Sequence, residues 1–199
     1  MLSPKKQSAQ DRTFQDGALT AELKTAQQLS ASTSNNSATA VKIATERRPE
    51  KERRIVASVL IPQPIDLVWK VITDYEHLAD FVPNLTSSKL IPNSEGRIRL
   101  EQMGTQCFLK FKFCARVVLD MTEQFPHEVG FDMKEGDFKM FKGAWKLRPD
   151  EDQRGTELSY DLLVKPPRAM PAALIEHHIC HNLTTNLLAI RQRTMDLAI

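Results

Sequence analysis

One group in this sequence has the chemistry of metal ligands: Glu176, His177, His178, Cys180 and His181. His177 and His181 are four positions apart, so in a helix they share a face at a spacing that can bind zinc. A metalloprotease helix would place the glutamate between the two histidines, whereas here it precedes both. The sequence indicates no third ligand. We therefore predict exposed helix residues and no metal site.

Acidic residues gather at Asp74, Glu76 and Asp80, beside Tyr75. A general acid or base needs a carboxylate held inside a pocket with a shifted pKa. These acids follow a predicted helix, where capping of backbone amides is the simpler role. The sequence has no Gly-rich phosphate loop, no nucleophile elbow and no Cys/His pair at a recognisable spacing. We predict no catalytic residues and no cofactor.

An alternation of apolar and polar residues at 108–121 is the clearest structural pattern. Every odd position from Leu109 to Met121 is apolar, and charged residues occupy the even positions Lys110, Lys112, Arg116 and Asp120. A period of two predicts one long strand with a dry face and a wet face. The dry face needs a cover, which a helix near the C-terminus can provide.

The remaining elements can be predicted from periodicity and turn residues. Further strands are expected at 55–61, 87–91, 97–103, 128–133, 140–147 and 156–164, with a turn at 104–105. Helices are expected at 65–72, 74–81 and 172–197, the last with Ile179, Leu183, Leu187, Ile190 and Leu197 in one stripe. The fold class is therefore α+β: a curved antiparallel sheet of about seven strands around a long C-terminal helix, with two short helices after the first strand.

A sheet closed over a helix encloses an interior that could hold a ligand. The candidate apolar lining is Phe111, Phe113, Phe131, Phe141, Trp145, Ile175 and Ile179, with Phe81 at the mouth. The candidate polar groups are Gln102, Tyr160, Asn182 and Asn186. Alternatively, the apolar side chains interdigitate without a void, Gln102 bonds to water or backbone, and the asparagines bond to neighbouring loops.

Residues 1–53 are predicted to be a disordered or weakly ordered tail, and residues 54–199 the folded domain. From Ala26 to Ala40 almost every residue is Ala, Gln, Ser, Thr or Asn, which cannot bury enough apolar surface to fold. The three cysteines form no disulfide framework, so we expect an intracellular, cytoplasmic protein. A plastid transit peptide is the alternative, although such peptides are poor in acidic residues and this tail contains several.

The formal net charge of +2 does not favour nucleic acid, and we expect no DNA partner. A basic row is formed by Lys110, Lys112 and Arg116, with Lys139, Lys142 and Lys146 expected on a neighbouring strand. A solvated sheet face is the simplest interpretation. Peripheral contact with a membrane, RNA or an acidic protein is the alternative.

Several motifs resemble a known family. They are Ile61-Pro62, Val68-Trp69, Ile72-Thr73-Asp74-Tyr75, Phe81-Val82-Pro83, Gly143-Ala144-Trp145, Gly155–Tyr160 and Asn182-Leu183. With the element order, they resemble the START-like (SRPBCC) helix-grip superfamily, which includes polyketide cyclases/dehydrases, coenzyme-Q-binding proteins and lipid-transfer domains. The resemblance covers 54–197 and implies a helix-grip fold that binds a hydrophobic molecule such as a lipid, prenylquinone or pigment. The alternatives are a polyketide-type cyclase/dehydratase and a module that docks a protein or ribosome.

Overall fold

The computed structural model describes residues 40–94, 96–108, 111–151, 154–168 and 170–198, except the side chains of 105–113. Residues 41–199 form one unit. The strands are β1 (Lys42–Arg47), β2 (Arg53–Ile61), β3 (Leu85–Leu90), β4 (Ile98–Phe108), β5 (Phe111–Gln124), β6 (Glu128–Gly136), β7 (Met140–Pro149) and β8 (Thr156–Lys165). The helices are η1 (Pro49–Lys51), α2 (Ile65–Thr73), η2 (Tyr75–His77), α3 (Leu78–Phe81) and α4 (Ala172–Asp196).

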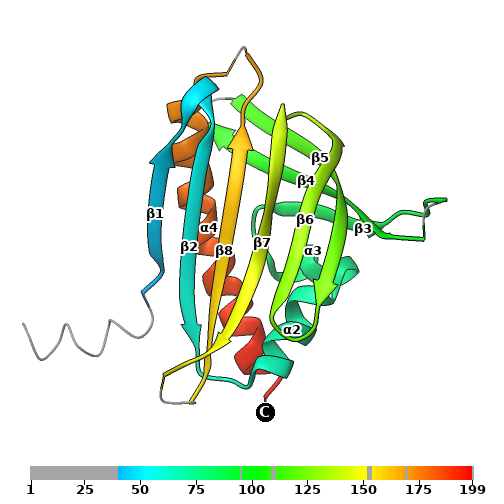
Figure 1. Cartoon of the computed structure of the whole chain (residues 1–199), viewed down its shortest axis with the longest axis vertical. Helices are drawn as coiled ribbons and strands as arrows, with labels where there is room; N and C mark the ends of the chain where they lie inside the picture. Colours follow the sequence, from blue (N-terminus) through cyan, green and yellow to red (C-terminus); the bar gives the residue numbers. More distant parts are fainter. Residues whose placement is uncertain (1–39, 95, 109–110, 152–153, 169, 199) are drawn as a thin grey trace, which may run out of the picture. The chain divides into compact units, whose positions relative to one another are not determined.

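The strands form an 8-stranded antiparallel sheet in the order β1-β2-β8-β7-β6-β5-β4-β3. In Figure 1 the long helix α4 lies behind β2 and β8, and α2 and α3 lie toward β3. The main contacts of α4 are with β2 and α2. The predicted α+β fold is confirmed, and the sheet has one strand more than expected.

The additional strand is β1, which lies in the segment predicted to be a tail. Lys42 pairs with Ser58 and Arg47 with Arg53, so the folded unit begins about a dozen residues before the predicted boundary at 53/54. The charged run 46–54 covers the end of β1 and the beginning of β2. It folds because its charges find partners: Arg54 forms an ion pair with Asp161 at 2.8 Å, and Arg53 with Glu176 at 2.7 Å.

The predicted turn at 104–105 is wrong. Gly104 and Thr105 lie inside β4, paired with Ala115 and Cys114 of β5. The residues predicted as one strand over 108–121 therefore belong to two strands, since Phe108 ends β4 and β5 begins at Phe111. The predicted dry face is confirmed for its described part, since Val117, Leu119 and Met121 are buried.

Asp120, on the predicted wet face, is also buried. Its carboxylate accepts a hydrogen bond from Arg99 Nε at 2.6 Å, and Lys134 Nζ lies 3.9 Å away. The register of β5 against β6 shifts between Val118 and Leu119, so that Lys134 is the residue left without a partner across the ladder. These ion pairs hold the pKa of the Asp120 carboxyl below its usual range, with the Arg99 hydrogen bond as the main cause.

Helix α2 buries one apolar face, made of Val68, Trp69, Val71 and Ile72. The helix predicted at 74–81 is divided into η2 and α3. In α4 the buried stripe contains Leu183, Leu187 and Ile190, and the predicted stripe ends before Leu197, which is exposed. Thr194 is buried in this stripe, and its hydroxyl donates to the Ile190 carbonyl at 2.8 Å.

Polar contacts join α4 to β1 and β2, at one edge of the sheet, near both ends of the helix. Near its beginning, the Glu176 carboxylate accepts from Arg53 Nε at 2.7 Å and from Thr45 Oγ1 at 3.0 Å. Near its end, Arg191 Nε donates to the Leu60 carbonyl at 3.2 Å. The helix is therefore held along one side of the sheet.

We expect Glu176→Gln to lower the free energy of unfolding by about 1–3 kcal/mol at pH 7, because it removes a charge-assisted hydrogen bond. Burial raises the pKa of Glu176, but the hydrogen bonds from Arg53 and Thr45 outweigh it, so the pKa lies below the ordinary 4.5. A carboxyl with a lowered pKa stabilises the fold above its unfolded pKa and loses that contribution as the pH falls.

Urea unfolding at pH 7 and at pH 3 measures this effect. The difference between wild type and Glu176→Gln should shrink at the lower pH. The matched control is Glu157→Gln, which changes an exposed glutamate on β8 and should leave stability unchanged. An equal loss at both pH values would contradict the assigned role of the ion pair.

Candidate functional site

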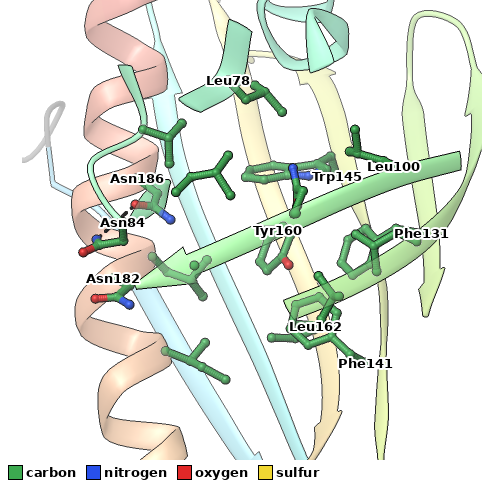
Figure 2. Close-up of a pocket in the computed structure, with 18 of the residues that line it drawn as sticks. Leu78, Asn84, Leu100, Phe131, Phe141, Trp145, Tyr160, Leu162, Asn182 and Asn186 are labelled. Atoms are coloured by element: carbon green, nitrogen blue, oxygen red, sulfur yellow. Dashed lines mark hydrogen bonds between the residues drawn. The ribbon is translucent and has the colours of Figure 1, made fainter. Parts of the chain in front are cut away.

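A cavity of about 220 Å3 lies between α4 and the sheet. Its wall includes residues of β4, β5, β6, β7, β8 and α4, and of the segment from α2 to β3 (Figure 2). Helix α4 packs mainly against β2 and α2. The apolar faces of β4 to β7 are therefore not covered by the helix, and they form part of the cavity wall instead. Pockets that bury drug-sized molecules measure roughly 300–1,000 Å3. The volume suits a compact ligand or one part of a larger ligand.

Aromatic side chains form the wall on the strand side. The rings of Phe131 and Tyr160 stack with centroids 5.3 Å apart, and Trp145 lies 4.3 Å from Tyr160. The ring centroid of Phe141 lies 5.7 Å from that of Phe131 and 5.4 Å from that of Phe138. Such pairs contribute about 0.5–1.5 kcal/mol each beyond their burial. The rings therefore support one another and keep this wall in place.

Most of the residues predicted to contact a ligand line the cavity: Gln102, Phe131, Phe141, Trp145, Tyr160, Ile179, Asn182 and Asn186. Two others do not. Ile175 is buried near the beginning of α4, and Phe81 lies under the Arg193 guanidinium, 5.8 Å from its ring centroid. The side chains of Phe111 and Phe113 lie outside the described part. For all of them, contact with a ligand stays a prediction.

Further lining residues were not predicted, among them Tyr75, Asn84 and Phe138. Tyr75 was grouped with acidic residues at a helix end, and Asn84 lies in a connection after Pro83. Phe138 lies between β6 and β7, with the charged residues Asp137 and Lys139 on either side. A large aromatic residue beside charged turn residues was the available signal that this segment folds back over the core.

A chain of hydrogen bonds connects Gln102 to the backbone of Tyr75. Gln102 Nε2 donates to Ser88 Oγ at 3.2 Å, and Ser88 Oγ donates to the Tyr75 carbonyl at 2.6 Å. The Tyr75 hydroxyl donates to the Glu123 carboxylate at 2.6 Å. Burial and this carboxylate raise the pKa of Tyr75 well above its usual value, so the phenol stays protonated. The partner of Gln102 is thus a side chain rather than water or backbone.

Asparagines form the polar part of the wall beside α4. Asn84 Nδ2 donates to Asn186 Oδ1 at 3.3 Å, and Figure 2 shows Asn182 next to them. The two alternatives for Asn186 are therefore both realised, since it bonds to a loop residue and also lines the cavity. All three side chains are half-buried, whereas Tyr160 and Leu162 are buried.

Charged side chains are absent from the described wall of the cavity. The predicted capping role of Asp74 is wrong, because its side chain makes no capping hydrogen bond and instead contacts His77 Nδ1 at 2.6 Å. His177 and His181 are exposed, and the described residues contain no group of three or more potential metal-ligating side chains. No helix in the described ranges is long and apolar enough to cross a membrane.

The predicted basic row is interrupted. β6 lies between β5 and β7, so the lysines of β7 are not on a strand adjacent to Arg116. Arg116 itself forms ion pairs with Glu101 at 2.6 Å and Glu135 at 2.7 Å. Lys110 and Lys112 have side chains outside the described part. The described face therefore mixes both signs of charge.

The family model described as "Polyketide cyclase / dehydrase and lipid transport" matches residues 61–191, more than half of the chain. Among solved structures, the fold is similar to that of the protein TTHA0849 from Thermus thermophilus, with a TM-score of 0.63 and 19% identity over 73% of this chain and 99% of that one. The fold is also similar to that of a STAR-related lipid transfer protein from Xanthomonas axonopodis, with a TM-score of 0.62 and 15% identity over 78% of this chain and 93% of that one.

The Zhui aromatase/cyclase from Streptomyces sp. R1128 gives a TM-score of 0.61 and 15% identity, over 74% of this chain and 96% of that one. At these identities the similarity establishes the fold, which is the START-like helix-grip fold. A search of the curated proteins finds no match.

We expect Ser88→Ala to lower the free energy of unfolding by about 1–3 kcal/mol, because Ser88 is 5% exposed and its loss leaves the Tyr75 carbonyl and the Gln102 amide without a partner. The matched control is Ser87→Ala, one position along β3, where the side chain points to the other face of the strand. Urea unfolding of both variants measures the effect. Equal stability of the two would contradict the hydrogen-bond chain.

Proposed function

The chain belongs to the polyketide cyclase/dehydrase and lipid transport family, and we propose that it binds and carries a hydrophobic small molecule in the cavity beneath α4. The observation that carries this proposal is the composition of the cavity wall, in which aliphatic and aromatic side chains predominate and a few uncharged polar groups interrupt them. Such a wall favours ligands with a large apolar surface, since burial of that surface drives binding.

Access to the cavity is proposed beside the asparagines. Asn84 lies between α3 and β3, and Asn182 and Asn186 lie on the facing side of α4. Their partial exposure contrasts with the burial of Phe131 and Tyr160. An amphipathic ligand would enter with its apolar end first and leave its more polar end near these amides.

We favour a carrier over a cyclase or dehydratase. Proton transfer in such reactions needs a positioned acid or base with a pKa near the working pH. The titratable groups in the described wall are the phenols of Tyr75 and Tyr160, and burial raises the pKa of both. Neither phenol can act as a base near neutral pH, which supports binding without turnover.

Organic extraction and mass spectrometry of the protein purified from its own cells test the proposal. We expect one hydrophobic species to be enriched over a mock purification. Titration with Nile red, a neutral dye whose emission rises in apolar surroundings, should show saturable binding to the purified protein. A protein that carries no extractable species and does not bind the dye would contradict the proposed function.

Val117→Phe should weaken Nile red binding at least about tenfold, a loss of about 1.4 kcal/mol in binding free energy. Val117 is 8% exposed and lines the cavity from β5, so the larger ring occupies the space that a ligand would take. Filling an existing void avoids most of the cost of about 1–3 kcal/mol that overpacking of a dense core carries. The folded state should therefore survive.

The control for this variant is Thr122→Phe, which adds the same ring at an exposed position of β5. Dye titration and urea unfolding are measured for both. Unchanged dye affinity in folded Val117→Phe would place the dye site outside the cavity.

A further inference from the structure

Tyr160 is a buried polar residue of the cavity wall. Its ring lies between Phe131, stacked at 5.3 Å with an interplanar angle of 14°, and Trp145, at 4.3 Å. It is 8% exposed and lies on β8, near the middle of the sheet. The packing on both sides fixes the direction of the hydroxyl, which Figure 2 shows within the group of lining side chains.

The two tyrosines of the cavity differ in how their hydroxyls are bonded. Tyr75 donates to the Glu123 carboxylate at 2.6 Å. Tyr160 lines the same cavity, yet none of the described residues accepts a hydrogen bond from it. A hydroxyl that loses water without gaining another partner costs about 1–3 kcal/mol. A ligand that supplies an acceptor would avoid this cost on binding, whereas a wholly apolar ligand would incur it.

The Tyr160 hydroxyl is a donor at every physiological pH, because burial raises the pKa of the phenol above its usual value. Its surroundings are Phe131, Phe141, Trp145 and Leu162, which offer no hydrogen-bond acceptor in their side chains (Figure 2). A ligand hydroxyl placed here would either accept from the Tyr160 hydroxyl or donate to it, and in both cases one of the two protons would stay unpaired. A carbonyl oxygen, which only accepts, fits this position better.

Charge further restricts the ligand. The described wall contains no Lys, Arg or His to pair with a carboxylate, and its other polar groups are neutral amides, the Trp145 indole N–H and the bonded Tyr75. Removing an ionised carboxylate from water costs several kcal/mol unless it is paired. The wall therefore disfavours an ionised acid and accepts a neutral ester, ketone or quinone.

We propose that the cavity selects a neutral carbonyl compound, with its carbonyl oxygen bonded to the Tyr160 hydroxyl, over an ionised carboxylic acid of the same carbon skeleton. This inference rests on the proposed function, because it defines the ligand class of the same cavity. The apolar body of the ligand then lies against the aromatic wall. Its other end faces Asn84, Asn182 and Asn186.

The test uses the full chain and three ligands with one carbon skeleton: a methyl ketone, the alkane without the oxygen, and the carboxylic acid. Each displaces Nile red from wild type and from Tyr160→Phe at about pH 7.5. In wild type the ketone should bind at least about tenfold more tightly than the acid. In Tyr160→Phe the affinity for the ketone should fall about 3- to 10-fold, as expected for one hydrogen bond, while the alkane is unaffected.

Tyr160→Phe also has a prediction that needs no ligand. Because the hydroxyl has no described partner, its removal should leave the ligand-free protein as stable as wild type or more stable in urea. A clear loss of stability would indicate a structural hydrogen bond and overturn the assignment.

The remaining outcomes separate the two proposals. Equal effects of the substitution on ketone and alkane would overturn the role of Tyr160, and acid binding as tight as ketone binding would overturn the selection for neutral ligands. Saturable Nile red binding in either case leaves the proposed function intact. If neither dye nor ligand binds wild type, both proposals fail.

Discussion

The structure depends on a difference in width: the apolar face of the sheet is wider than the area that the long helix α4 covers. Ion pairing of Glu176 with Arg53 and the bond from Arg191 to the Leu60 carbonyl hold α4 along β2. The dry face continues through β5 with Val117, Leu119 and Met121, and these side chains meet the cavity rather than the helix. Apolar surface left beside a fixed helix forms the wall of the cavity.

The segment from α2 to β3 closes the remaining side, and its polar groups are bonded within the wall. Ser88 links the Tyr75 backbone to Gln102, and Asn84 reaches across to Asn186 on α4. These contacts satisfy most of the polar atoms that the cavity would otherwise expose to a ligand. The Tyr160 hydroxyl has no such bond to a described residue, and the proposed ligand class rests on it.

Much of this architecture could be predicted from sequence because its signals are local. The alternation along β5 and the apolar stripe of α4 indicated which side chains face inward, and Phe131, Trp145 and Asn186 line the cavity as expected. The errors arose where distant partners decide structure. β1 forms from a charged segment, and the arginines of β2 beside it pair with Asp161 and Glu176, more than a hundred positions away. Gly104 resembled a turn residue, but its pairing with Ala115 keeps it inside a strand.

The protein contains two tryptophans, and only Trp145 lines the cavity, whereas Trp69 packs on Phe125 with ring centroids 5.4 Å apart. The most direct test of the account is therefore the fluorescence of Trp69→Phe, in which Trp145 is the single reporter, during titration with a neutral hydrophobic ketone. The account predicts a saturable change in Trp145 emission, and none in Trp145→Phe, where Trp69 reports. A response from Trp69 alone, or from neither residue, would contradict a ligand site beneath α4.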